Sequence, residues 1–424
     1  MHILSFFLLG ILPVIALATF QTPDPIFGKG YSKIYDGERE FSINMIKQIR
    51  ENHPTGNLFF SPFSTYNALL LAYFGSSAAT ESELAQVLKL GWATSKDQVV
   101  SAYTISKVKD KMRSRQSPLT LSSVNRIFVD KLVQVNKTFE IILHNEIEKI
   151  DFKYQPENSL SLINDWIANK TYDQIRDMLS SDDISSETMF VLANAAYMKG
   201  DWLSQFKVEN TIPKRFYINE YEHEQVPMMH QTATFKITYN ERLQSQILKL
   251  PYRTLFQSAE TRISTPEDKS DISMVIILPV SNEVNVNDVI SRLDAKSLGN
   301  LIDMARPEKV DLAVPKFEFQ QRLKLTPILA GMGLTNMFDS SATFKDLTPE
   351  HISIDDAQHF AKIKVDEMGS TAAAATVLFT SRSAKQPDPN KFICDHPFVF
   401  LIYDEKVKTI LFAGVYSDPR KMKH

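Results

Sequence analysis

Helical patterns and strand patterns occupy different parts of this chain, and their separation limits the folds that it can adopt. Near the N-terminus, apolar side chains recur at helical spacing at Phe41, Met45, Ile46 and Ile49, and the stretch 61–74 continues this pattern. Thr80 and Glu83 have the spacing of a capping box and predict another helix start before Leu84.

Strand patterns predominate in the later part of the chain. The expected strands are Leu119–Val129, Thr188–Lys199, Asp271–Pro279, Val310–Phe319, Ala361–Glu367, Phe398–Asp404 and Thr409–Tyr416. Helices and strands that do not alternate strictly favour an α+β architecture over a wound parallel sheet. The 424 residues contain no repeat or low-complexity linker between Phe41 and Tyr416, so we expect one large domain, with residues 258–270 as an extended surface loop.

The first eighteen residues are typical of an export signal. Residues 3–18 are apolar apart from Ser5 and end in Ala16-Leu17-Ala18, the small-x-small pattern of a signal-peptidase site. The alternative is a membrane anchor, but the run is shorter than the roughly 20 residues that a spanning helix needs, and Gly10 and Pro13 interrupt it. We therefore expect a secreted protein without a membrane association. The sequons at Asn136 and Asn169 predict a glycoprotein.

Composition excludes several classes of function. Lys and Arg total 47 against 50 Asp and Glu, so a net charge of −3 argues against a nucleic-acid partner. The single cysteine, Cys394, permits neither an intrachain disulfide nor a cysteine-based zinc site, and we expect a buried, inert thiol. His223 and His230 lack metal-ligand spacing on a helix, so no metal site is expected. The sequence contains no nucleophile, Walker or dinucleotide motif, so we do not expect an enzyme. We expect a monomer.

The most informative segment lies near the C-terminus. Residues 370–381 contain no charge, proline or glycine, and Val377, Leu378 and Phe379 favour a strand. Gly369 precedes this segment, and a polar stretch with Arg382, Lys385 and two prolines follows it, which is typical of an exposed loop. One alternative is an ordinary core strand followed by a loop. The alanine run could also start a helix.

Five motifs in order resemble those of the serpin family, and the resemblance covers residues 41 to 419. They are NLFFSPFS at 57–64, LANAAYMKGDW at 192–202, VPKF at 314–317, KVDEMGS at 364–370 and DHPFVFLI at 395–402. The sequence looks most like the secreted insect members. The resemblance implies a single domain with N-terminal helices, a large mixed sheet, further β-sheets and an exposed reactive-centre loop. After the signal peptide at 1–18, we therefore expect an N-terminal extension at 19–35 and a serpin domain at 36–424, with a reactive loop at about 369–391.

Serpins are suicide inhibitors of serine proteases, so the resemblance implies that a target cleaves the loop and is trapped as an acyl-enzyme while the loop inserts into a sheet. The implied hinge comprises Glu367, Gly369, Ser370, Thr371, Ala372, Ala373, Ala374 and Ala375. In the family's register Ser370, Ala372, Ala374 and Thr376 face inward, and all four are small. Met368 and Thr371 stand where many members carry acids. The rival interpretation is a non-inhibitory serpin that acts as a carrier, storage protein or chaperone, but no bulky, charged or proline residue between 370 and 376 favours it.

Three bonds compete as the cleavage site. Arg382-Ser383 is favoured on chemical grounds, because trypsin-like enzymes place an aspartate in the primary pocket that pairs with arginine. Strict counting from Gly369 selects Ser383-Ala384, which would suit an elastase-like target, and Lys385-Gln386 is third. The expected partner is a trypsin-like extracellular protease. In an insect the analogy extends to the cascade enzymes of haemolymph immunity.

Two further sets of residues follow from the resemblance. Ser61, Ser64, Asn194 and His359 would form a hydrogen-bonded shutter beneath the opening strands, with Trp202 in the turn above and Lys316 paired with Glu367. A basic run would bind a glycosaminoglycan-like polyanion, the only cofactor considered. Its residues are Lys107, Lys109, Lys111, Arg113 and Arg115. The alternative for this run is a solvated helical face, interrupted by Asp110.

Overall fold

The computed structural model describes residues 25–114, 119–143, 145–253, 271–354, 357–368 and 388–422. The predicted signal peptide, the surface loop at 258–270 and residues 369–387 of the reactive loop lie outside these ranges. The helices are α1 (Pro25–Asn52), α2 (Pro62–Gly75), α3 (Ala78–Val87), α4 (Lys96–Ser114), α5 (Lys137–Ile142), α6 (Pro156–Lys170), α7 (Val286–Arg292), α8 (Ala295–Met304) and α9 (Thr326–Gly331). Short 3₁₀ helices η1, η2 and η3 span Val208–Asn210, Asn336–Phe338 and Pro419–Met422.

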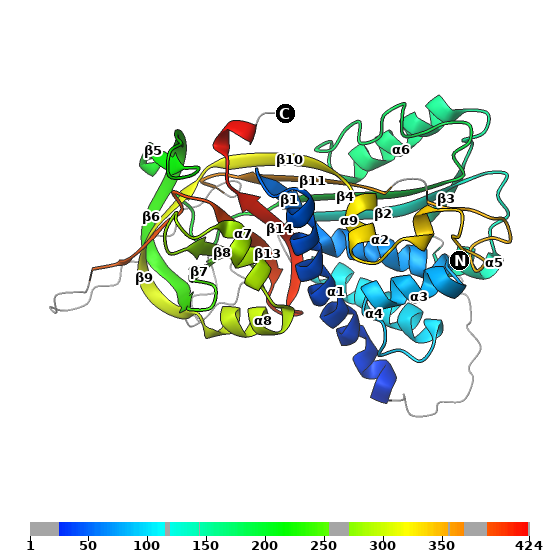
Figure 1. Ribbon diagram of the computed structural model, residues 1–424, viewed down its shortest axis with the longest axis horizontal. Coiled ribbons are helices and arrows are strands. Elements are labelled where there is room, and N and C mark those ends of the chain that lie inside the picture. Colours follow the sequence, from blue (N-terminus) through cyan, green and yellow to red (C-terminus); the bar gives the residue numbers. More distant parts are fainter. Residues whose placement is uncertain are drawn as a thin grey trace, which may run out of the picture.

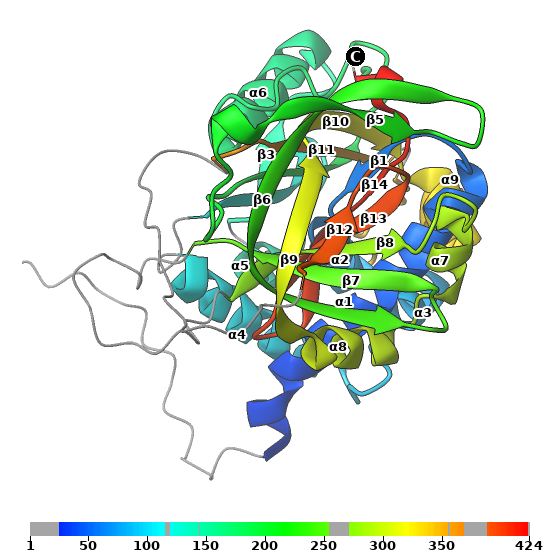
Figure 2. The ribbon, with the colours of Figure 1, turned by 90° about the vertical axis from the view of Figure 1, so that its left-hand side faces the viewer.

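The strands form two mixed sheets. A five-stranded sheet has the order β10 (Phe317–Lys324), β11 (Gln358–Val365), β4 (Phe190–Lys199), β2 (Thr120–Asp130) and β3 (Ile147–Ile150). A nine-stranded sheet has the order β1 (Leu58–Phe60), β14 (Thr409–Tyr416), β13 (Phe398–Asp404), β8 (Ile272–Pro279), β7 (Ser245–Pro251), β6 (His223–Asn240), β9 (Arg306–Pro315) and β12 (Asn390–Ile393), and β5 (Ile212–Tyr217) pairs with β6. Figure 2 views the nine-stranded sheet from the end where β6, β9 and β12 lie.

Helices cover both faces of the five-stranded sheet. Helices α1 to α4 lie on one side and α6 on the other (Figure 1). The predicted apolar face of α1 is fully buried, from Phe41 to Ile49. Helix α2 is buried on almost every side, and its N-terminus is capped by Ser61, whose Oγ accepts a hydrogen bond from the Ser64 amide, with Pro62 in the first turn. Hydrogen bonds from Ser61 to His359 of β11 and to Leu411 of β14 hold the start of α2 against both sheets. The helices and the two mixed sheets confirm the predicted α+β class.

Two local predictions are wrong. The predicted capping box does not form, because α3 begins at Ala78, before Thr80. Glu83 instead accepts hydrogen bonds from the backbone amides of Thr335 and Asn336 at the start of η2. The single strand expected at 310–319 is two strands that break at Lys316, whose amide donates to the Pro227 carbonyl oxygen at 2.8 Å. Among the described residues, no helix is both long enough and apolar enough to span a membrane.

Candidate functional site at the seam between two parallel strands

The centre of the five-stranded sheet is a parallel pair. β4 and β11 are paired in register from Ala193 with Gln358 to Met198 with Ile363, and we call these six pairs the seam. Parallel pairing is slightly less stable per residue than antiparallel pairing. A strand that followed β11 through a reversal and lay in the seam would run antiparallel to both neighbours. The seam is therefore a place where another strand can be added with favourable geometry on both edges. β2 and β3 form a second parallel pair in this sheet, but only the seam is bordered by β11, the strand that leads into residues 366–368.

A buried polar cluster crosses the seam at its second residue pair. Asn125, Asn194 and His359 stand opposite one another on β2, β4 and β11, because Asn194 is the register partner of both other residues. His359 Nδ1 hydrogen-bonds Asn194 Oδ1 directly across the seam. Asn194 Nδ2 lies 2.5 Å from the side-chain amide of Asn125. Side chains thus reinforce the backbone ladder at one level of the sheet.

The start of α2 completes this cluster. The Ser61 amide donates to His359 Nε2 at 2.8 Å, and Ser61 Oγ donates to the Leu411 carbonyl oxygen of β14 at 2.7 Å. Ser64 Oγ accepts hydrogen bonds from Asn194 Nδ2 at 2.8 Å and from Ser123 Oγ at 3.0 Å. We call these six residues the seam cluster: Ser61, Ser64, Ser123, Asn125, Asn194 and His359. The cluster joins one helix start to strands of both sheets.

His359 is neutral in this environment. Because the Ser61 amide donates to Nε2, the ring proton is on Nδ1, which donates to Asn194. His359 is fully buried, and burial lowers its pKa to about 3. The structure brings together the four residues that the resemblance placed here, and their role in opening the sheet stays a prediction. Sequence reasoning missed Ser123 and Asn125, because only the pairing of β2 with β4 brings them to the cluster, and the sequence carries no signal for that pairing.

The chain beyond β11 is held by a segment that follows β4. We call residues 201–206 the strap and residues 366–368 the pre-loop segment. The Trp202 indole Nε1 donates to the Asp366 carbonyl oxygen at 2.8 Å, and the Phe206 amide donates to that of Glu367 at 3.0 Å. Gln205 Nε2 donates to that of Met368 at 3.0 Å. Trp202 is buried and stacks on Tyr252 with ring centroids 4.5 Å apart. Because Tyr252 directly follows β7, the stacked rings hold the strap against the end of that strand.

An ion pair closes the same end of the seam. Lys316 Nζ, in the break between β9 and β10, lies 2.8 Å from Glu367 Oε2. The Glu367 side chain is only 7% exposed. Its burial would raise the pKa of Glu367, but hydrogen bonds to the carboxylate, first that from Lys316, hold the pKa below its ordinary value. Glu367 is therefore ionised at neutral pH and ties the pre-loop segment to the nine-stranded sheet.

The predicted reactive loop falls almost wholly outside the described residues. The hinge positions from Gly369 to Ala375 and the competing cleavage positions lie there, the latter being Arg382, Ser383, Ala384, Lys385 and Gln386. The next described residue is Asp388, and β12, which starts two residues later, pairs in parallel with β9. The loop predictions thus remain predictions from sequence, attached to a described pre-loop segment on one side and to β12 on the other.

The basic run on α4 is largely engaged in contacts with its neighbours. Lys107 lies 3.1 Å from Glu146, and Lys109 lies over the Tyr31 ring at 3.9 Å from its centroid. Arg113 forms an ion pair with Asp110 and lies 3.7 Å from Asp404. Lys111 is exposed, and Arg115 is outside the described residues. Acidic partners therefore reduce the positive charge of this face, and polyanion binding stays a prediction.

The two sequons differ in their surroundings. Asn136 is exposed as the N-cap of α5, and its Oδ1 accepts a hydrogen bond from the Thr138 amide at 3.0 Å. Asn169 is exposed near the end of α6, but the Thr171 hydroxyl is fully buried and donates to the Ile167 carbonyl oxygen at 2.8 Å. Attachment of a glycan at either asparagine stays a prediction.

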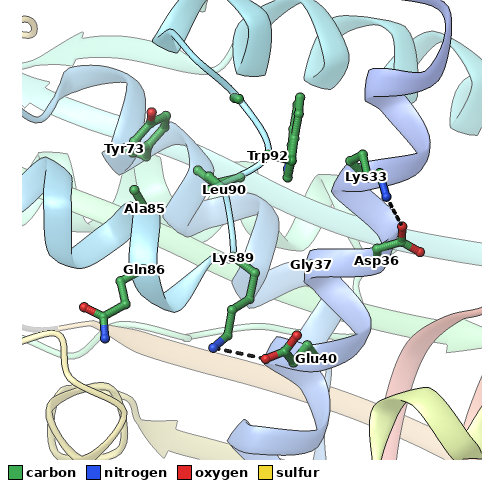
Figure 3. Close-up of a pocket in the computed structure, with 12 residues that line it drawn as sticks. Lys33, Asp36, Gly37, Glu40, Tyr73, Ala85, Gln86, Lys89, Leu90 and Trp92 are labelled. Atoms are coloured by element: carbon green, nitrogen blue, oxygen red, sulfur yellow. Dashed lines mark ion pairs between the residues drawn. The ribbon is translucent and has the colours of Figure 1, made fainter. Parts of the chain in front are cut away.

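A separate cleft of about 690 Å³ lies between α1 and the connection from α3 to α4 (Figure 3). Two ion pairs border it, Lys33 with Asp36 and Lys89 with Glu40, so its rim carries no excess charge. No seam-cluster residue lines it.

In the described ranges no group of three or more His, Cys, Asp and Glu residues is placed to hold a metal ion. Cys394 is buried, and its burial raises the pKa of the thiol, which favours the inert form.

Comparisons with known proteins agree with this geometry. A sequence model of the family described as Serpin (serine protease inhibitor) matches residues 36–419. The chain is 52% identical over 426 residues to Serine protease inhibitor 88Ea of Drosophila melanogaster, covering 100% of both chains. Among solved structures it is similar to maspin, with a TM-score of 0.80 and 24% identity over 92% of this chain and 100% of that one. Serpin-12 of Manduca sexta gives a TM-score of 0.76 and 24% identity over 91% and 98%. The two solved structures show the fold.

Proposed function

Because this chain belongs to the serpin family, we propose that it is a secreted suicide inhibitor of serine proteases with a trypsin-like extracellular target. The observation that carries the proposal is the parallel seam between β4 and β11, whose strands are paired in this structure. Of these two strands, β11 leads through the pre-loop segment into the predicted reactive loop. The small, uncharged residues from Ser370 to Ala375 supply a segment that suits insertion there. The 52% identical relative is named a serine protease inhibitor, which supports the same proposal.

The proposed reaction begins with the chemistry of the target. The target's serine Oγ attacks the carbonyl carbon of Arg382 and forms an ester, the bond to the Ser383 nitrogen breaks, and the target's histidine delivers the proton to the leaving amine. The guanidinium of Arg382 would pair with the carboxylate in a trypsin-like primary pocket. Ser383 and Lys385 remain the alternative residues on the acyl side of the cut.

Insertion then competes with hydrolysis of the ester. The freed segment after Gly369 would enter the seam antiparallel to β4 and β11 and gain a hydrogen-bond ladder on each edge. The attached protease moves with the segment before water completes hydrolysis. The seam cluster and the Lys316–Glu367 pair hold the sheet closed until cleavage. These residues control a conformational change and are not catalysts.

The test is complex formation with trypsin. An equimolar mixture should give a denaturant-resistant covalent complex on a gel, and mass spectrometry of the released C-terminal peptide should show Ser383 as its first residue. A peptide that begins at Ala384 or Gln386 would reassign the bond. Absence of a complex with a panel of serine proteases would contradict inhibition and favour a carrier, storage or chaperone role.

A matched pair of variants tests insertion itself. Ala374 belongs to the side of the segment that would face inward, and Ala375 to the opposite side. Ala374→Glu should turn the inhibitor into a substrate, because insertion would bury an unpaired carboxylate. Ala375→Glu should keep complex formation. Retained complex in Ala374→Glu would contradict the insertion mechanism.

Export is the remaining part of the proposal. The signal-peptidase pattern that ends at Ala18 and the exposed sequon at Asn136 support it. Expression in insect cells should place the protein in the medium with Thr19 as its first residue. Retention in the cells with an intact N-terminus would contradict secretion.

A further inference from the structure

The pre-loop segment is held through three successive backbone carbonyls. The strap donates a hydrogen bond to each one: the Trp202 indole to Asp366, the Phe206 amide to Glu367 and the Gln205 side chain to Met368. The bond from Gln205 is the one nearest along the chain to Gly369, where the predicted loop begins. It differs from the others because its donor is a polar side chain that a substitution removes without changing the backbone or the aromatic stack.

The donor side of this contact is itself fixed. Ser204 Oγ donates to Gln231 Oε1 at 2.9 Å, and Gln231 Nε2 donates back to the Ser204 carbonyl oxygen at 3.1 Å. The Leu203 amide donates to the Pro251 carbonyl oxygen at 2.9 Å. The strap is thus attached to β6 and to the end of β7 immediately before Gln205. Because the backbone next to Gln205 is held, no further backbone entropy is lost when its amide binds Met368, and only the side-chain rotamer entropy of the glutamine opposes the contact.

We propose that Gln205 is a positioning residue that latches the Met368 carbonyl and thereby raises the barrier to loop insertion. The inference rests on the proposed function. A segment that enters the seam must reverse direction just after β11, so the Met368 peptide unit lies where the chain has to turn. As long as its carbonyl accepts the Gln205 hydrogen bond, that peptide unit keeps its orientation. The bond is to the backbone, so it does not depend on the side chain at position 368.

The size of the effect follows from one hydrogen bond in a half-buried site. Such a bond contributes a net stabilisation that corresponds to roughly a two- to twelvefold change in a rate or equilibrium constant. Gln205 and Met368 are both partly exposed, so we expect the lower part of that range. Removal of the donor should therefore speed opening of the pre-loop segment severalfold and leave the remaining strap contacts intact.

The test uses the full-length protein and the variants Gln205→Ala and Gln205→Glu. The matched control is Gln225→Ala, which truncates an exposed glutamine on β6. Heating the intact protein should convert it to the loop-inserted, denaturant-resistant form about two to six times faster in Gln205→Ala than in the wild type. Gln205→Glu should be at least as fast, because a carboxylate cannot donate and repels the carbonyl. A purely structural role would also lower the unfolding temperature of the cleaved protein, whereas loss of a latch should leave that temperature unchanged.

Hydrogen–deuterium exchange of a peptide that contains residues 366–368 gives a readout that does not require inhibition. Its amides should exchange about two to six times faster in Gln205→Ala than in the wild type and in Gln225→Ala. Equal exchange and equal conversion rates in all proteins would overturn the latch. If the wild type forms no complex with any protease but Gln205→Ala still exchanges faster, the latch stands and the inhibitory function fails.

Discussion

Lowering the pH should weaken the fold through His359, the central residue of the seam cluster. The ordinary pKa of a histidine is 6.5, whereas burial lowers the pKa of His359 to about 3 in the folded protein. Between these values the unfolded chain binds a proton that the folded chain does not, so stability falls as the pH falls. The contribution of neutral His359 is complete above pH 6.5 and is lost progressively down to pH 3.

The magnitude follows from the difference in pKa. A pH of 5 is 1.5 units below the ordinary pKa of a histidine. At about 1.36 kcal/mol per unit, the free energy of unfolding falls by about 2 kcal/mol. Buried Glu38 acts in the opposite direction, because burial raises its pKa to about 8 and the folded state therefore binds its proton more tightly. A single pH titration of the wild type would mix the two effects. The effect of His359 must therefore be measured as a difference between two proteins that both contain Glu38, so that its contribution cancels.

The variant His359→Gln provides this comparison. A glutamine can accept the Ser61 amide hydrogen bond and does not titrate, while Glu38 is present in both proteins. Urea unfolding, followed by tryptophan fluorescence, should be measured for both at pH 7.5, 6 and 5. The stability of the wild type relative to the variant should fall by about 0.8 kcal/mol at pH 6 and about 2 kcal/mol at pH 5. The exposed His53 offers the control substitution His53→Gln. A difference between wild type and His359→Gln that is independent of pH would refute the reasoning.

Three further substitutions test the packing around the seam. Asn194→Ala leaves buried partners without hydrogen bonds and should lower the free energy of unfolding by about 2 to 4 kcal/mol, measured by urea denaturation; a loss below 1 kcal/mol would contradict the role of the seam cluster. Lys316→Ala removes the partner of buried Glu367 and should cost about 1 to 2 kcal/mol at pH 7, reduced because the lysine is 42% exposed. Since the pKa of Glu367 is lowered in the fold, this cost should shrink as the pH falls below 4.5, and a cost that grows in acid would contradict the pairing. Gly414→Ala would place a Cβ 2.2 Å from the Phe400 ring and should cost about 3 kcal/mol or prevent folding, whereas wild-type thermal stability would show that the aromatic layer has room.

The sequence predicted several buried strands well because their side chains form nearly continuous apolar runs, although the buried strands β1 and β7 were not among those expected. β13 and β14 have the predicted bounds, and every residue in both is buried. β6 was not among the expected strands, because exposed residues, Pro227 and Tyr239 among them, interrupt its buried ones and leave no continuous apolar run. The strand expected at 310–319 also looked continuous, since a tertiary hydrogen bond of the Lys316 amide, and not a local turn signal, marks its break.

The candidate site was less accessible to sequence reasoning. Ser61, Ser64, Asn194 and His359 carry no pattern of their own, and only the resemblance placed them together. The contact of Gln205 with Met368 leaves no trace in the sequence, because one partner is a backbone carbonyl that any residue supplies. Contacts of this kind depend on how two distant segments are positioned, which local periodicity does not encode.

The parallel pairing of β4 and β11 has a consequence for the behaviour of many molecules together. An opened gap between two parallel strands accepts any extended, uncharged peptide of suitable length, and it does not distinguish a peptide of its own chain from one that a neighbouring molecule offers. If the seam opens as proposed, we expect crowded or heated solutions to link molecules into chains. We therefore expect the hydrogen bonds from Ser61 to His359 and from His359 to Asn194 also to keep the molecules apart.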